Sequence, residues 1–193
     1  MPINTPNLLT WFRILMIPVF ITVFYVSDDT ISIHNKHLIG TLMFVAAAIT
    51  DWLDGYLARY LNQMSAFGAF LDPVADKLMV SAALIVLLKL GYVDEIVAFI
   101  IIGREIAISA LREWMAQLGS GKSIAVSMLG KIKTTFQMLA IVFLLYHESI
   151  LSIPIEKLGT VLIYIAALLT LWSMVYYLML AIPQITKKTT ERN

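Results

Sequence analysis

The stretch DWLDGYLARYLNQMSAFGAFLDPVAD, residues 51–76, carries four aspartates between two strongly apolar segments. An ionised carboxylate is among the costliest groups to bury in a lipid bilayer. Yet the rest of the chain suits a bilayer: 60% of its 193 residues are hydrophobic, 14% are charged, and the mean hydropathy is +0.83. These values lie outside the range of ordinary soluble domains. The sequence therefore predicts an integral membrane protein whose buried acids need an explanation.

Six apolar segments are long enough to cross about 30 Å of hydrocarbon as helices. They lie near residues 8–26, 38–61, 66–89, 94–117, 126–147 and 157–182. The first lacks the basic start and the cleavage pattern of a signal peptide, so we expect it to remain in the mature protein. Only short polar or turn-forming connections separate the segments. We expect a single all-α domain over residues 1–193 with six transmembrane helices.

Lysine and arginine are distributed unequally between the two ends of these segments. One side carries Arg13, Arg59, Arg112, Lys122, Lys131, Lys133, Lys187, Lys188 and Arg192, and the other carries Lys36, Lys89 and Lys157. Positive charge marks the cytoplasmic side, so we expect both termini and the turn between the second and third segments there. A site formed by the four aspartates would open to the cytoplasm. The net charge of +1, with no basic stripe, argues against nucleic-acid binding.

The aspartates are spaced to meet across a helical hairpin. One arc of about 140° on the first helix holds Asp51, Asp54, Gly55, Ala58 and Arg59. One stripe on the next helix holds Gly68, Asp72 and Asp76. Asp54 and Asp72 lie about 10 Å from the connecting turn along the helix axis, and the other two aspartates lie about 15 Å from it. An antiparallel hairpin therefore brings the acids level in pairs.

Carboxylates gathered in this way would repel each other unless cations were present. All-oxygen ligands suit Mg²⁺, Mn²⁺ or Ca²⁺, and four carboxylates can bridge two ions. The chain has no cysteine, and we expect His34, His37 and His147 to be surface loop residues that bind nothing. The alternative is structural: Asp72 caps a helix before Pro73, and the acids of the preceding helix pair with Arg59 or Lys77. That alternative leaves the common facing of the four acids unexplained.

The spacing D-x-x-D-G-x-x-A-R, eight residues, G-x-x-x-D-x-x-x-D resembles the signature of the CDP-alcohol phosphotransferases, membrane enzymes that make phospholipids. Three further stretches resemble the bacterial phosphatidylglycerophosphate synthase branch of that family. They are PNLLTWFRI near the start, GREIAISALREWMAQLG in the fourth segment and LGKIKTTFQM in the fifth. Together the similar stretches cover most of the chain.

This resemblance implies a six-helix homodimer in the bacterial cytoplasmic membrane that uses Mg²⁺ or Mn²⁺, with two ions expected. The implied reaction transfers a phosphatidyl group from CDP-diacylglycerol to sn-glycerol 3-phosphate and releases CMP. By resemblance, the metal ligands are Asp51, Asp54, Asp72 and Asp76. Asp76 also matches the residue proposed to deprotonate the acceptor hydroxyl. The CDP group would be held by Gly55, Ala58 and Arg59, together with Asn7, Thr10 and Arg13.

A phosphorylated acceptor brings a second concentrated negative charge and calls for basic residues. Arg104 lies well inside the fourth segment, and Arg112, Lys131 and Lys133 lie nearer the cytoplasmic ends of the fourth and fifth. We interpret these four as the acceptor-phosphate pocket. Alternatively, Arg104 pairs with Glu105 or an aspartate, and the two lysines reach anionic lipid headgroups. The lysines point about 160° apart on a helix, so both are not expected to touch one small ligand.

Three other functions are compatible with part of this pattern. The same kind of enzyme could use serine, inositol or inositol phosphate as its acceptor, although the free alcohols would not require a dianion site. A divalent-cation transporter would also bury carboxylates, but it requires a polar path through the whole membrane. A non-catalytic membrane scaffold is the third alternative.

Overall fold

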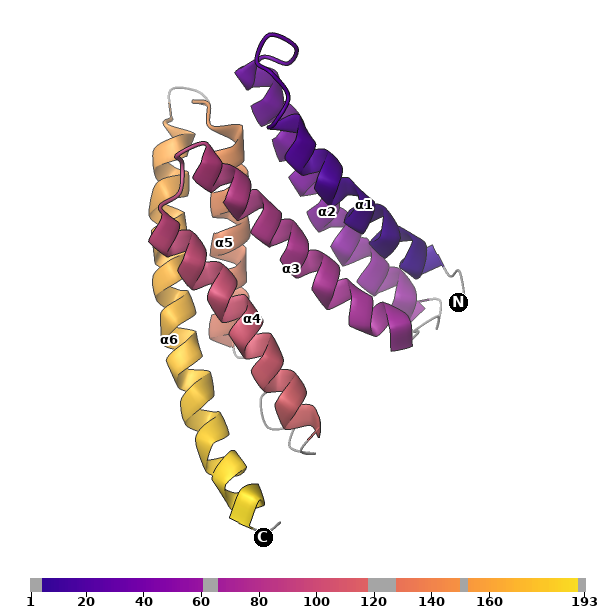
Figure 1. Cartoon of the computed structure of the whole chain (residues 1–193), viewed down its shortest axis with the longest axis vertical. Coiled ribbons are helices and arrows are strands. Elements are labelled where there is room, and N and C mark those ends of the chain that lie inside the picture. The colour runs from indigo at the N-terminus through magenta and orange to yellow at the C-terminus, as the bar shows by residue number, and fades with distance from the viewer. Residues whose placement is uncertain (1–4, 61–65, 118–127, 150–152, 191–193) are drawn as a thin grey trace.

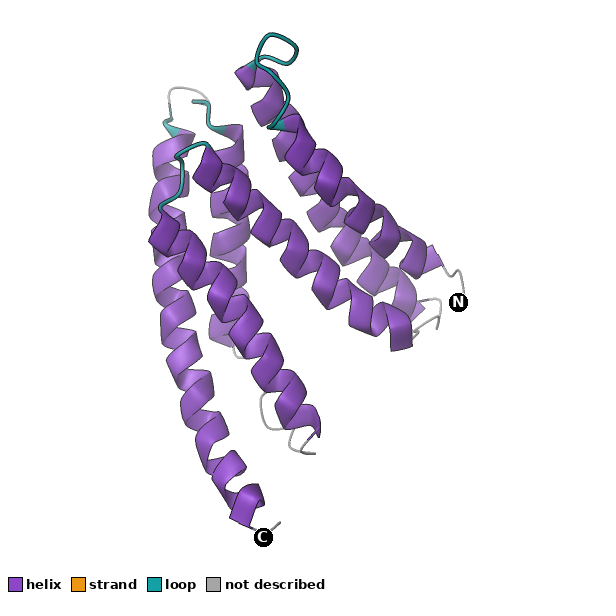
Figure 2. Cartoon of the chain, viewed as in Figure 1, coloured by secondary structure: helices purple, strands orange, loops and turns teal. Residues whose placement is uncertain are grey.

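A computed structural model describes residues 5–60, 66–117, 128–149 and 153–190 (Figure 1). Its elements are the helices α1 (Thr5–Val23), α2 (Ile33–Tyr60), α3 (Ala66–Lys89), α4 (Glu95–Gln117), α5 (Met128–Tyr146) and α6 (Ile155–Thr190) (Figure 2). Each apolar segment expected from the sequence forms one of these helices. The all-α prediction is thereby confirmed.

Successive helices run in alternating directions (Figure 1). α1 packs against α2 and α3, α5 packs against α6 and α2, and α4 packs against α3 and α6. The turn between α3 and α4 contains Gly91 at a φ of +75°, a left-handed conformation that glycine adopts without a steric penalty. This turn sends α4 back beside α3, so the ends of α2, α3 and α4 that carry the charged residues can meet.

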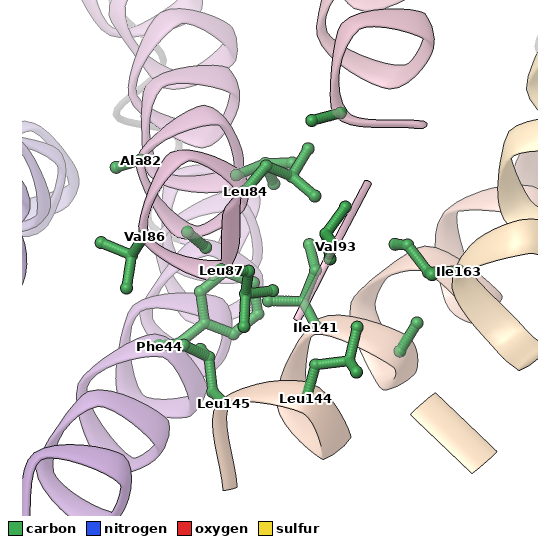
Figure 3. Close-up of a cluster of buried hydrophobic side chains, with 14 of the residues drawn as sticks. Phe44, Ala82, Leu84, Val86, Leu87, Val93, Ile141, Leu144, Leu145 and Ile163 are labelled. Atoms are coloured by element: carbon green, nitrogen blue, oxygen red, sulfur yellow. The ribbon is translucent and has the colours of Figure 1, made fainter. Parts of the chain in front are cut away.

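The main hydrophobic core occupies the half of the bundle nearest the α3–α4 turn. Phe44 from α2, Leu84 and Leu87 from α3 and Ile141 from α5 are buried there with their neighbours (Figure 3). Ile163 extends the same core to α6. Phe20 of α1 and Ile101 of α4 belong to this core as well, so apolar burial joins all six helices at one end. The aspartates of α2 and α3 lie toward the other end.

Two helices in the described part of the chain are long and apolar enough to cross a membrane, over Ile33–Asp54 and Ile155–Met179. α1 and α5 have shorter apolar runs, Leu8–Val23 and Ile132–Tyr146. α3 and α4 are long enough, but charged side chains such as Asp76 and Arg104 interrupt their apolar runs. The composition and the two long apolar helices indicate a membrane protein.

The end of the bundle opposite the aspartates carries polar and aromatic contacts beside a pocket of about 620 Å³. His147 stacks on Tyr92 with ring centroids 3.6 Å apart, and the hydroxyl of Tyr92 lies 3.2 Å from Nε2 of His37. The prediction that His34 and His37 are loop residues is wrong, because both lie within α2. His34 is at the surface as expected, whereas His37 is buried. The buried ammonium of Lys36 donates to the carboxylate of Asp28 at 2.5 Å.

Replacing Gly40 by alanine should destabilise the packing of α1 on α2. A Cβ atom at this position would lie 2.3 Å from Cζ of Phe24, and the Phe24 ring is buried against Phe20, so it cannot simply turn aside. Overpacking of this kind costs about 1–3 kcal/mol. We expect a lower midpoint of thermal unfolding for Gly40→Ala in detergent.

Gly103→Ala is the matched control, because its Cβ would meet nothing within 4 Å. Alanine favours a helix over glycine by about 1 kcal/mol, so this midpoint should stay level or rise. Equal midpoints for the two variants would contradict the close approach of α1 to α2.

Candidate active site

A cavity of about 400 Å³ lies among the charged residues, with walls from α2, α3, α4, α5 and α6. Asp51, Asp72 and Asp76 line the side formed by α2 and α3. Arg104 and Arg112 line the side formed by α4. The cavity therefore has an acidic wall and a basic wall that face a common space.

The acidic wall depends on residues of α1 for its arrangement. Thr10 Oγ1 donates to Asp72 Oδ1 at 2.5 Å. Arg13 Nη1 donates to Asp51 Oδ1, and Arg13 Nη2 donates to Asp54 Oδ2. Thr10 and Arg13 are three positions apart on one face of the helix. In this structure α1 thus contacts the acids of both α2 and α3.

Burial distinguishes the aspartates from one another. Asp54 is 2% exposed, and Arg13, its partner, is 1% exposed. Asp51 is partly exposed and lines the cavity, as do Asp72 and Asp76 one helical turn apart on α3. Asp54 is absent from the cavity lining. The predicted grouping therefore places three aspartates around one space and the fourth behind them in a buried ion pair.

The basic wall is organised by Glu105. Its Oε1 accepts from Lys133 Nζ and, at 3.1 Å, from Arg104 Nη1. Arg104 also donates to Ser173 Oγ at 3.1 Å, and its guanidinium lies 5.8 Å from the ring centre of Tyr177. The pairing of Arg104 with Glu105, one of the alternatives considered from sequence, is thus observed.

The predicted acceptor-phosphate residues separate into different environments. Lys133 is 1% exposed and does not line the cavity. Arg112 lines the cavity and has no ion pair among the described residues. The side chain of Lys131 lies outside the described residues, although its backbone belongs to α5. Of the three predicted residues whose side chains are described, Arg104 and Arg112 therefore face the space directly.

Sequence reasoning missed four polar residues of the cavity. Lys77 lines it beside Asp76, and the predicted alternative of a pair between Lys77 and Asp51 or Asp54 is not seen, since both carboxylates are bound to Arg13. Thr134 and Gln137 of α5 and Tyr177 of α6 also line it. The adjacency of Lys77 to Asp76 was the available signal for Lys77. The other three residues had no such signal, because their position depends on how distant helices cross.

The acidic wall offers the type of ligand atom that divalent ions prefer. Carboxylate oxygens are the ligands that Mg²⁺ and Mn²⁺ prefer, and the guanidinium bound to Asp51 and Asp54 shows that a cation is accommodated there. Within the described residues, however, no three acidic or histidine side chains are grouped closely enough to hold one ion together. The predicted convergence on a common ion is not seen, and metal binding stays a prediction.

An apolar groove lies beside the cavity. Its volume is about 320 Å³, and it is lined by Phe44, Val45, Ala48, Ile49 and Trp52 of α2 and by Met138, Leu139 and Val142 of α5. Met138 also lines the charged cavity. A smaller pocket is lined by Arg13, Asp51 and Asp76 of the acidic side and by Ala48 and Met138, which also line the apolar groove. The apolar groove is therefore contiguous with the acidic wall.

Four of the six residues predicted to hold the CDP group have side chains that the structure does not describe. Asn7 belongs to α1, and Gly55, Ala58 and Arg59 belong to α2. Their side chains fall outside the described residues. Thr10 and Arg13 contact aspartates, as given above. The assignment of these six residues to the CDP group stays a prediction.

Comparison with known proteins supplies the family. A family model described as CDP-alcohol phosphatidyltransferase matches residues 3–172. A Haemophilus influenzae protein named CDP-diacylglycerol–glycerol-3-phosphate 3-phosphatidyltransferase is 50% identical over 183 residues, 94% of this chain and 95% of the relative. Relatives of the same name from Salmonella typhimurium and Escherichia coli are 48% and 47% identical over 180 residues, 92% of this chain and 94% of each relative. The resemblance seen in the sequence is thereby confirmed, and the chain is an enzyme that belongs to the CDP-alcohol phosphatidyltransferase family.

Proposed function

We propose that this enzyme transfers the phosphatidyl group of CDP-diacylglycerol to sn-glycerol 3-phosphate and releases CMP. The observation that carries the proposal is a cavity that combines an acidic wall, a basic wall and an adjoining apolar groove. A lipid nucleotide and a small phosphorylated alcohol need these three environments together. The names of the relatives support the same donor and acceptor.

The donor pyrophosphate belongs at the acidic wall. Asp51, Asp54, Asp72 and Asp76 would hold two Mg²⁺ or Mn²⁺ ions there. Bound ions would neutralise the charge of the pyrophosphate and of the departing CMP. Arg59 would add a fork of donors for a phosphate, and Asn7, Thr10, Arg13, Gly55 and Ala58 would complete the nucleotide site.

The acyl chains of the donor belong in the apolar groove between α2 and α5. The groove is lined by hydrocarbon and aromatic side chains, and Met138 lies between it and the charged cavity. Burial of a CH₂ group from water contributes about 0.8 kcal/mol. The acyl chains of a membrane lipid start in hydrocarbon, so their burial in the groove contributes less than this. Its main effect is to orient the phosphorus at the acidic wall.

The acceptor belongs between the two walls. Its phosphate would meet Arg112, Lys77 and Arg104, while Lys133 acts through Glu105, which it holds in place. Asp76 would take the proton of the acceptor hydroxyl as its oxygen bonds to the lipid-side phosphorus and the bond from phosphorus to CMP breaks. The chain has no cysteine, and a single displacement needs no covalent enzyme intermediate. Lys131 remains a candidate for the same phosphate.

We further propose that all six helices span the cytoplasmic membrane of a bacterium as a homodimer, with both termini in the cytoplasm. Large apolar side chains such as Phe99, Leu168 and Trp172 are exposed on the outer faces of the helices, as lipid contact requires. The excess of Lys and Arg on one side supports the orientation. The cavity then opens to the side where glycerol 3-phosphate is found.

The decisive experiment measures CMP release by purified protein in detergent with Mg²⁺, CDP-diacylglycerol and a panel of alcohols. We expect release with glycerol 3-phosphate, and little with serine or free inositol, because the basic wall favours a phosphorylated acceptor. Release with a free alcohol alone would move the enzyme to another branch of the family. Ion flux in proteoliposomes without lipid turnover would favour a transporter instead.

Asp76→Asn should abolish CMP release while leaving the fold and the binding of CDP-diacylglycerol intact. An amide at this position removes the group that accepts the proton but keeps its size, and loss of a general base reduces rates by about 10²–10⁴. Turnover is followed as CMP, and donor binding is followed by calorimetry. Near-normal turnover would remove Asp76 from the role of base.

Arg112→Ala should raise the KM for glycerol 3-phosphate by at least about ten-fold and leave the KM for the lipid donor nearly unchanged. A charge-assisted contact to phosphate contributes about 1.5–3 kcal/mol, and Arg112 lines the cavity on the α4 wall. Arg112→Lys is the matched variant and should recover part of the loss. Equal effects on both substrates would dismiss the assignment of this wall to the acceptor.

Ala48→Phe should fill the apolar groove and raise the KM for CDP-diacylglycerol without changing that for glycerol 3-phosphate. Ala48 lines the groove but not the charged cavity. The control is Ile85→Phe, at an exposed apolar position on α3. Steady-state kinetics in mixed micelles at varied donor concentration provides the measurement. If the two variants behave alike, the acyl chains lie elsewhere.

A further inference from the structure

Arg13 is the most deeply enclosed charged group at the acidic wall. Its residue is 1% exposed, and both terminal nitrogens are bound to carboxylates, one on Asp51 and one on Asp54. Asp54 is itself 2% exposed. An isolated charge at that depth would be strongly unfavourable, so each group depends on the other for its charged state. The guanidinium thus fills the position of a counter-cation.

The same two carboxylates are the ligands expected for a divalent ion. The guanidinium uses Oδ1 of Asp51 and Oδ2 of Asp54, and an ion that bridges these residues needs oxygens from the same pair. A guanidinium and a divalent ion next to each other would repel strongly at low dielectric. Occupation of this place by one cation therefore disfavours occupation by the other.

We infer that Arg13 is a built-in competitor for the divalent ion: it holds Asp51 and Asp54 when no ion is bound, and an ion must displace it. This inference rests on the proposed function for the identity of the ligands. Thr10 keeps its own contact with Asp72, so α1 can stay on α3 while the guanidinium leaves the acids. Arg13 is then a positioning residue of the acidic wall that sets the affinity for the ion.

The test is a titration of Mn²⁺ into purified full-length protein in detergent, read by the electron paramagnetic resonance signal of the free ion. Arg13→Ala should bind Mn²⁺ about 5- to 150-fold more tightly than the wild-type protein, the range of ordinary coupling between two ligands. Arg13→Lys keeps the charge but not the fork that reaches two carboxylates. Competition therefore predicts a clear gain in affinity for Arg13→Lys as well, whereas general repulsion between charges predicts none.

Lys36→Ala is the matched control. Lys36 is also a buried cation, 4% exposed and paired with Asp28, but it lies at the opposite end of α2 from the acidic wall. Its removal should lower the midpoint of thermal unfolding equally with EDTA and with Mn²⁺. Arg13→Ala should lower the midpoint with EDTA and recover most of the loss with Mn²⁺, because the ion replaces the missing counter-charge.

Wild-type affinity for Mn²⁺ in both Arg13 variants would overturn the inference, as would binding by none of the proteins. If Arg13→Ala does not fold without metal, the Mn²⁺ affinity of Arg13→Lys is compared with that of the wild-type protein. The midpoint of thermal unfolding of both proteins, with EDTA and with Mn²⁺, gives the second comparison. CMP release by the wild-type protein is measured separately. Loss of the predicted affinity difference with normal CMP release defeats only the inference, and absent CMP release with the difference intact defeats only the proposed reaction.

Discussion

Charged groups inside an apolar helical bundle must be given counter-charges, and the charged half of this molecule is arranged to satisfy that requirement. On one side, among the described residues, the guanidinium of Arg13 binds two carboxylates. On the other side a single carboxylate, Glu105, holds two cations. The two triads have opposite net charge, and each contributes residues to one side of the cavity: Asp51 from the first, and Arg104 and Glu105 from the second. A space between them favours ligands that carry both cationic and anionic parts, such as a metal-bound phosphate.

These triads also determine how the helices are joined. Arg13 joins α1 to α2, and Glu105 brings Lys133 of α5 against α4. The apolar core ties all six helices together at the far end, and part of it is drawn in Figure 3. Close packing there gives the bundle its rigidity, so the charged half can remain hollow. The division explains why a cavity exists in a chain so rich in apolar residues.

The sequence predicts well what depends on one helix at a time. Apolar length gives the helices, and the four-residue spacing of Asp72 and Asp76 puts both on the cavity wall, as the structure confirms. It predicts poorly what depends on how helices cross. Arg13 could be assigned to a nucleotide but not to Asp51 and Asp54, because its partners lie 38 and 41 positions away in the chain. Lys133 was likewise predicted to bind the acceptor phosphate, but in the structure it is buried and its ammonium donates to Glu105.

The position of the apolar groove bears on the order of events at the site. In the proposed arrangement the acyl chains of the donor lie along the groove of α2 and α5, and the acceptor lies against α4, so neither substrate needs the place of the other. A covalent enzyme intermediate is needed when the substrates take turns at one place. Separate places for the two substrates favour direct attack of the alcohol on the lipid phosphorus. The separate walls thus favour a ternary complex, in which proximity supplies a large part of the rate.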